Sequence, residues 1–260
     1  MLRKSLLSFV AVAAVASAAF AQAANPTVDE LIEKNIQAKG GREKLKAVQT
    51  RRLTGKMLVG PGLEAPFVLE QARPNKMRME FVIQGMTAVT SYDGTAGWQL
   101  MPFLGKKEAE QMSADDLKQA QDQAEFDGSF VDYKDKGNQV ELVGKEEVEG
   151  TPAYKLKVTK KSGDTEIVYL DADSFLEIQS EGKNMVRGQE VETVTSIGDY
   201  KEVQGVLFPF SIQSKPKGAA AGQGSFVMTI EKVEVNPQLA ADRFGKPEGA
   251  PAPAPAKPQQ

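Results

Sequence analysis

The sequence contains neither cysteine nor histidine, and it has a single tryptophan among its 260 residues. Without cysteine there are no disulfides, and without both residue types there are no zinc sites built from them. Catalysis by Ser-His-Asp or Cys-His groups is excluded for the same reason. A pair of carboxylates remains open in principle among the 35 Asp and Glu residues. These absences argue against an enzyme, and we expect no cofactor and no metal.

Positive charge is in slight deficit, because 32 Lys and Arg face 35 Asp and Glu, for a formal net charge of −3. Proteins that bind nucleic acid usually present a basic face, so we expect no nucleic-acid partner. The length suits one β-rich domain or two small ones.

Long apolar runs are missing except near the N terminus. Arg3 and Lys4 precede an apolar stretch that ends in an Ala19-Phe20-Ala21 cleavage pattern. The stretch is about 16 residues long, shorter than the ~20 that span a bilayer. We therefore expect residues 1–21 to be a signal peptide and the mature protein to be soluble and periplasmic. Residues 248–260 repeat Pro and Ala, which predicts a disordered tail.

Helical periodicity occurs at two places. Thr27 and Glu30 form a capping-box pattern, and Gly40-Gly41 follows as a stop signal. The apolar stripe of this first helix consists of Val28, Leu31, Ile32 and Ile36. Residues 106–125 are also rich in helix formers, with Ser113 as a candidate N-cap. This second segment is expected to be weakly buried or mobile, and the aromatic residues of 126–134 are expected to dock it onto the sheet.

From Thr50 onwards the apolar period changes to two, which predicts β-strands separated by short turns. After Ile230 the apolar parity flips to Val233, which predicts a bulge near Glu231-Lys232. About ten to twelve strands in series predict a large curved antiparallel sheet with one buried face. Helices laid against that face would bury it and leave a cavity between the layers.

Two neighbouring motifs carry a resemblance to a known family. R-P-N-K-M-R-M-E spans residues 73–80, and Y-D-G-T-A-G-W-Q-L-M-P-F spans residues 92–103. Their order and spacing resemble the LolA family of periplasmic lipoprotein carriers. Weaker motifs extend the resemblance to a LolA-like, lipid-binding domain over residues 25–247. It implies a half-open antiparallel β-barrel whose apolar concave face is covered by a helical lid.

The resemblance also implies site residues. Arg73 corresponds to an arginine that holds the lid closed through backbone carbonyls, although a plain surface arginine is the alternative. The stripe that begins at Val28 would be the apolar face of the lid helix. Residues expected to line the cavity are Met57, Met77, Met79, Phe81, Ile83, Met86, Trp98, Met101 and Phe103. Methionine suits a cavity that accepts flexible chains, but ordinary core packing explains these residues equally well.

Two functions follow from the resemblance. The first is a monomeric carrier of lipoprotein acyl chains or lipid, moving between an inner-membrane donor and an outer-membrane acceptor. The second is a lipid-sensing regulatory module that binds the periplasmic part of a membrane protein. The fold alone does not choose between them.

Overall fold

The computed structural model describes residues 26–59, 62–186, 189–219 and 224–248. The predicted signal peptide and nearly all of the predicted tail lie outside these ranges. Among the described residues, no helix is both long and apolar enough to cross a bilayer.

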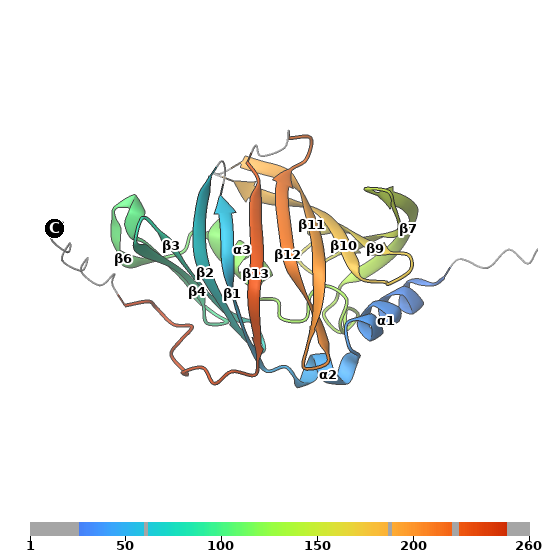
Figure 1. Ribbon diagram of the computed structural model, residues 1–260, viewed down its shortest axis with the longest axis horizontal. Coiled ribbons are helices and arrows are strands. Elements are labelled where there is room, and N and C mark those ends of the chain that lie inside the picture. The colour runs from blue at the N-terminus through green and yellow to red at the C-terminus, as the bar shows by residue number, and fades with distance from the viewer. Residues whose placement is uncertain (1–25, 60–61, 187–188, 220–223, 249–260) are drawn as a thin grey trace, which may run out of the picture.

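The chain forms one large antiparallel sheet that curves like half of a barrel, with helices on its concave side (Figure 1). The strands are β1 (Thr50–Val59), β2 (Leu63–Ala72), β3 (Lys76–Ile83), β4 (Met86–Tyr92), β5 (Gly97–Met101), β6 (Lys106–Gln111), β7 (Gln139–Val148), β8 (Thr151–Thr159), β9 (Thr165–Asp171), β10 (Glu177–Val186), β11 (Gln189–Val203), β12 (Val206–Pro216) and β13 (Phe226–Val235). The helices are α1 (Val28–Ala38), α2 (Arg42–Ala47), α3 (Ala114–Ala124) and the short 3-10 helix η1 (Pro102–Leu104). The predicted fold class is confirmed.

The sheet consists of two meanders joined at one seam. Its order is β6-β5-β4-β3-β2-β1-β13-β12-β11-β10-β9-β8-β7, so every neighbour pair is consecutive in sequence except β1 and β13. At the seam Thr54 pairs with Lys232 while Gly55 pairs with Ile230, which leaves Glu231 as an extra residue. The predicted bulge is therefore confirmed, and it explains why the apolar parity flips within β13.

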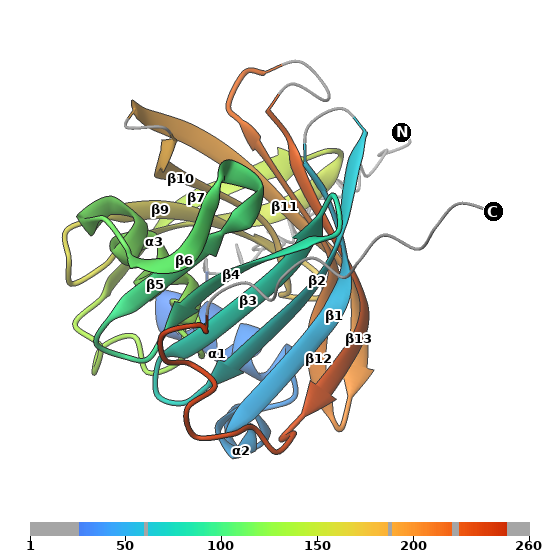
Figure 2. The ribbon, with the colours of Figure 1, turned by 90° about the vertical axis from the view of Figure 1, so that its left-hand side faces the viewer.

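Helix α1 begins where the sequence predicts. The Thr27 backbone amide donates to Glu30 Oε2 over 2.7 Å, and the Glu30 amide donates to Thr27 Oγ1 over 3.2 Å. Leu31 and Ile36 are fully buried. They pack on the β8 and β9 end of the concave face, against Leu156, Val158, Val168 and Leu170. Helix α1 thus covers the end of the sheet opposite to β3–β6 and their methionines, as Figure 1 shows; in Figure 2, seen from the β6 side, α1 lies behind β3 and β4.

The segment predicted as a second helix divides into two elements. Residues 106–111 form the edge strand β6, which pairs with β5, and only the part after Ser113 is helical. The Ser113 side chain caps α3 by accepting from the Asp116 amide. Ala120 and Ala124 of α3 pack on Met77 and Tyr92, so this helix covers the β3–β5 end of the concave face. Edge pairing has overridden the helix propensity of residues 106–111.

In the described part of the chain no helix lies across the middle of the concave face, although Leu45 of α2 packs against it. The side chains there form a central cluster, defined by Val48, Leu53, Met57, Ala65, Phe67, Phe126, Val206, Phe208, Phe210, Met228, Ile230 and Val233. Leu69, Met79, Phe81, Ile83 and Ile212 pack against this cluster and keep part of their surface accessible. The region between the two ends that α1 and α3 cover is therefore a buried apolar cluster bordered by partly accessible apolar side chains.

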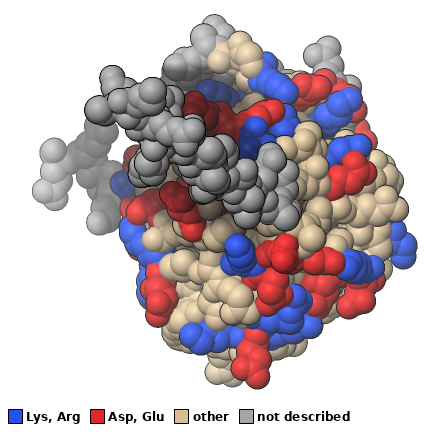
Figure 3. All heavy atoms as spheres, turned by 90° about the vertical axis from the view of Figure 1, so that its right-hand side faces the viewer, with Lys and Arg blue, Asp and Glu red and all other residues tan. Residues whose placement is uncertain are grey.

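The side of the molecule that carries α1 and β7–β10 is densely charged, with both signs interspersed (Figure 3). Several of these charges form exposed ion pairs, such as Lys155–Glu146 and Lys134–Asp29. Exposed pairs of this kind contribute little to stability, about 0–1 kcal/mol each, so the apolar concave face holds the fold.

Candidate functional site

A cavity of about 220 Å³ lies in the middle of the concave side. It is enclosed by the C-terminal end of α2, the connecting segment 125–131 and strands β11 and β12. Its walls are formed by Lys39, Leu45, Val48, Arg51, Glu125, Phe126, Asp127, Gly128, Val131, Glu177, Ile197, Tyr200, Val206, Leu207, Phe208, Pro209 and Ile212. Val48, Phe126, Val206 and Phe208 belong to the central cluster as well, so the cavity wall is continuous with that buried cluster.

The segment 125–131, together with the preceding end of α3, forms the cover of this cavity. Phe126 and Phe130 are 5% and 2% exposed, so both aromatic rings anchor the cover as the sequence predicts. Phe126 points into the central cluster, and Phe130 packs in the cluster under α1. The cover therefore bridges the two hydrophobic clusters, as Leu45 of α2 also does.

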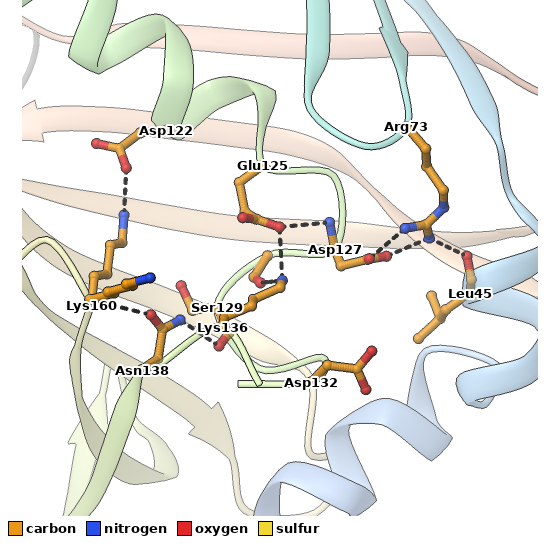
Figure 4. A network of polar contacts seen from close by, with 12 residues as sticks. Leu45, Arg73, Asp122, Glu125, Asp127, Ser129, Asp132, Lys136, Asn138 and Lys160 are labelled. Carbon is orange, nitrogen blue, oxygen red and sulfur yellow. Dashed lines mark hydrogen bonds and ion pairs between the residues drawn. The ribbon is translucent and has the colours of Figure 1, made fainter. Parts of the chain in front are cut away.

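Arg73 fastens the cover to the rim of the sheet (Figure 4). Its NH1 and NH2 groups donate to Asp127 Oδ2 and Oδ1, each over 2.5 Å. Its Nε donates to the Val48 carbonyl over 2.7 Å, and NH2 also donates to the Leu45 carbonyl over 3.0 Å. A guanidinium has five N–H donors in a fixed planar arrangement, and Arg73 forms four hydrogen bonds with them at this site.

These contacts match the predicted type of interaction but involve different partners. Arg73 binds backbone carbonyls at the end of a helix, as the resemblance implies, but that helix is α2. The predicted lid helix α1 lies elsewhere. Asp127, the carboxylate partner, was not anticipated, because nothing local in F-D-G-S-F distinguishes it from a turn aspartate. Its separation of 54 residues from Arg73 hides the pair from any local pattern.

Further ion pairs hold the chain that follows the cover. Glu125 pairs with Lys136 over 2.8 Å. Asp132 pairs with Arg42 over 2.7 Å and with Lys46 over 2.6 Å, which ties the loop to α2. The hydrogen bond from Lys46 and the charges of both cations keep the pKa of Asp132 below its ordinary value. The cover is thus held by charged contacts at its edges and by aromatic rings beneath.

The predicted cavity residues fall into three groups. Met57, Met79, Phe81 and Ile83 lie in or against the central cluster, beside the cavity but not in its wall. Met77 is fully buried in the cluster under α3. The third group is partly exposed near the β6 edge and consists of Met86, Met101 and Phe103. Phe103 reaches back to Phe81, with ring centroids 6.1 Å apart.

Trp98 does not join these residues. It pairs with Ser91, which in turn pairs with Arg78, and this row faces the convex side of the sheet. The C-terminal segment lies on that side, with the Lys246 ammonium 5.3 Å from the Trp98 ring centroid and Ser91 donating to the Gly245 carbonyl. Trp98 is therefore placed outside the concave face, because strand parity puts it opposite to Gly97 and its contact with α3.

The residues that the sequence reading missed at the cavity are Arg51, Asp127 and Tyr200. Burial raises the pKa of Tyr200, whose hydroxyl donates to the Glu177 carbonyl over 2.8 Å. Among the described residues no group of three potential metal ligands occurs. The arrangement offers an apolar hollow with a few fixed charges, which suits binding of an apolar chain.

No protein-family model matches the chain, and no curated protein matches its sequence. Solved structures do match it. An outer membrane lipoprotein-sorting protein domain from Vibrio parahaemolyticus aligns over 82% of this chain and 97% of its own, with a TM-score of 0.52 and 14% identity. A LolA superfamily protein from Nitrosomonas europaea aligns over 82% and 97%, with a TM-score of 0.53 and 12% identity. A DUF1329 family protein from Desulfovibrio piger aligns over 82% and 95%, with a TM-score of 0.57 and 13% identity.

At these identities the similarity establishes a shared fold. The half-barrel of this chain is the LolA-like fold that the motifs at residues 73–103 predict.

Proposed function

We propose that this chain is a periplasmic carrier that binds the acyl chains of a lipoprotein or lipid under the cover formed by residues 125–131. The observation that supports the proposal most is the apolar cluster in the middle of the concave face, with its partly accessible border. It adjoins a cavity and is bordered by a cover that charged contacts hold in place. In an ordinary core, packed side chains would fill the space that the cavity and the partly accessible side chains leave beside this cluster.

The size of the cavity indicates a closed state. Ligand pockets commonly measure about 300–1,000 Å³, whereas this cavity measures about 220 Å³. Moving the cover away would join the cavity to the accessible surfaces of Met79, Phe81 and Ile83. The opened groove would then accommodate a long chain without rearranging the sheet.

The energetics favour loading. Each methylene buried by the protein contributes about 0.8 kcal/mol, so ten give about 8 kcal/mol. Opening the cover breaks the Arg73 contacts, but the freed groups are hydrated again, so the net cost is about 1–3 kcal/mol. Ordering of the chain and of the protein reduces the gain further. The surplus is still sufficient for reversible binding, which a carrier requires.

The proposal is tested on the full chain after export and processing. Protein purified without detergent is extracted, and the extract is analysed for lipid by mass spectrometry. A fluorescent acyl probe is then titrated against the wild type and against Ile197→Phe, which narrows the cavity. Ser196→Phe is the matched control, because Ser196 is the adjacent residue of β11 and faces the other side of the sheet.

We expect co-purifying lipid, about one probe per chain, and binding that Ile197→Phe weakens at least tenfold while Ser196→Phe leaves it unchanged. Lipid should also move from donor vesicles to acceptor vesicles when the protein is present. The carrier proposal fails if the wild type holds no lipid and binds the probe no better than Ile197→Phe. If the protein binds lipid but does not transfer it between vesicles, and it captures one membrane protein, the regulatory module is the better interpretation.

A further inference from the structure

Arg51 is a cation in the wall of an otherwise largely apolar cavity. It lies near the start of β1 on the concave face, in register with Gln71 of β2 and Val235 of β13. Its Nε donates to Gln71 Oε1 over 2.7 Å, and its guanidinium lies over the Phe126 ring, 4.6 Å from the centroid. Arg73 lies over the same ring at the same distance. Two guanidinium groups therefore converge on the aromatic anchor of the cover.

The charges around the cavity do not balance within the protein. Each of the three carboxylates in its wall has its own cation. Asp127 pairs with Arg73, Glu125 with Lys136 and Glu177 with Lys39. After these three pairs are formed, no carboxylate of the cavity wall is left to pair with Arg51. No carboxylate in the described part of the chain forms an ion pair with it, and its two terminal nitrogens find no acceptor among the described residues.

Such an arrangement is costly for the fold. Arg51 is partly exposed in the cavity wall, so its charge is only partly hydrated, and the described residues supply no counter-ion for it. Burial lowers the pKa of Arg51 to about 10, with the nearby charge of Asp127 opposing the shift, so the group stays protonated at neutral pH. Leu53 and Met57 continue the same face of β1 with apolar side chains. An apolar residue at position 51 would extend that row without leaving an uncompensated charge.

We propose that the cavity binds an acyl chain whose anionic head, a carboxylate, forms a bidentate pair with the terminal nitrogens of Arg51. This inference rests on the proposed function and names the class of its ligand. A planar carboxylate matches the guanidinium fork and accepts two parallel hydrogen bonds. The head then lies next to Phe126, beneath the cover.

The direction of the chain follows from the sheet. An apolar row crosses the strands at Ile197, Ile212, Met228 and Met57, in direct register. About six residues of strand separate Met57 from Arg51, which is roughly 20 Å of extended backbone. The acyl chain runs from Arg51 past Phe208 towards this row, with a charged group at one end only.

Ligand series and charge variants test the assignment. Palmitate, hexadecanol and hexadecyl phosphate compete with a fluorescent acyl probe at pH 8, where the carboxylate is ionised and Arg51 is protonated. The variants are Arg51→Met, Arg51→Lys and Lys56→Met. Lys56 is the matched control, because it lies on the same strand, its pair with Glu64 is exposed and its replacement removes the same charge.

We expect wild type to prefer palmitate over hexadecanol at least tenfold. Arg51→Met should remove the preference while it retains hexadecanol binding, and Arg51→Lys should restore part of it. Lys56→Met should behave as wild type. If Arg51→Met still prefers palmitate over hexadecanol, the assignment is overturned. If wild type binds hexadecyl phosphate more tightly than palmitate, the head group is a phosphate and the carboxylate assignment is wrong.

The result also separates this inference from the carrier proposal. Equal affinity of wild type for palmitate and hexadecanol refutes only the role of Arg51, whereas failure to bind either refutes both. Should Arg51→Met not fold, palmitate labelled with ¹³C at its carboxyl carbon is titrated while bound to wild type. A carboxyl pKa below that of the same lipid in a neutral micelle supports the pair, and an equal or higher one contradicts it.

Discussion

Arg73 and Asp127 form a bidentate ion pair that joins the turn between β2 and β3 to the cover of the cavity, with both oxygen–nitrogen distances at 2.5 Å. The Arg73 side chain is 20% exposed and the Asp127 side chain 16% exposed, so water reaches neither group freely. The same guanidinium holds two carbonyls at the end of α2. One side chain therefore fixes both the cover and the helix beside it.

Replacing Arg73 by Leu should loosen the cover without unfolding the protein. We expect the free energy of unfolding to fall by about 1–3 kcal/mol, because the charged hydrogen bonds are lost while the apolar concave face remains. Retained lipid should increase, since the closed state loses its contacts. The measurements are thermal unfolding and lipid content per chain. Loss of the cooperative transition together with loss of lipid would make Arg73 purely structural.

Asp127→Asn provides the matched test of the same contact. It keeps the shape of the side chain and removes the charge. If the pair acts as a unit, the double variant Arg73→Leu/Asp127→Asn should be no less stable than Arg73→Leu alone. Additive losses would show that the two residues act independently.

The ion pairs of Asp132 with Arg42 and Lys46 attach the chain that follows the cover to α2, and they should make this attachment depend on pH. The pKa of Asp132 is held below its ordinary value of 3.8, so the stabilisation is present at neutral pH. It disappears as pH falls through the lowered value in the folded protein. We expect Asp132→Asn to cost about 0.5–1 kcal/mol at pH 7 and less near pH 2, measured by denaturant unfolding.

Asp135→Asn is the control for this measurement. Asp135 lies in the same loop, is exposed and forms no ion pair among the described residues. Its replacement should leave stability unchanged at both pH values. An equal loss in Asp132→Asn and Asp135→Asn would attribute the effect to overall charge.

The features that the sequence predicts correctly depend on neighbouring residues. The capping box at Thr27 and the parity flip before Val233 are both local patterns, and the structure confirms both. The part of the sheet that α1 covers depends on which strands pair far along the chain, and periodicity carries no such information. Trp98 illustrates the same limit. The resemblance placed it in the cavity lining, whereas the register of β5 turns it outwards.

The cavity itself was predicted from architecture, but its walls were not. The methionines of β3–β5 were the expected lining because they are adaptable and lie close to the recognisable motif. The observed walls come instead from α2, the cover and β11–β12. Arg51 and Asp127 stand there with partners 20 to 54 residues away in sequence. Such residues become visible only when the fold brings them together.

Gly40 should tolerate no side chain at the junction of α1 and α2. A Cβ at this position would lie 2.2 Å from the Gly205 carbonyl oxygen, in the turn between β11 and β12. Its φ of 119° is also unfavourable for other residues. We expect Gly40→Ala to destabilise by about 2–4 kcal/mol, since strain and backbone displacement add.

Gly41→Ala separates the two contributions. Gly41 has a φ of 90°, and the nearest atom to its added Cβ is Gln37 Oε1 at 3.5 Å. This variant should suffer the conformational strain alone, about 1 kcal/mol. Equal losses in the two variants, compared by thermal unfolding, would exclude the clash with Gly205.

Trp98 offers a direct test of where a bound acyl chain lies, because it is the single tryptophan of the chain. A brominated fatty acid quenches tryptophan fluorescence only at close range. Since Trp98 faces the convex side under the C-terminal segment, we expect saturating brominated ligand to leave its emission unchanged. In Trp98→Phe combined with Phe208→Trp, the new indole lies in the cavity wall, and we expect strong quenching there. Unbrominated ligand is the control for indirect effects. Quenching of Trp98 in the wild type, with none at position 208, would move the binding site to the convex face and contradict both proposals.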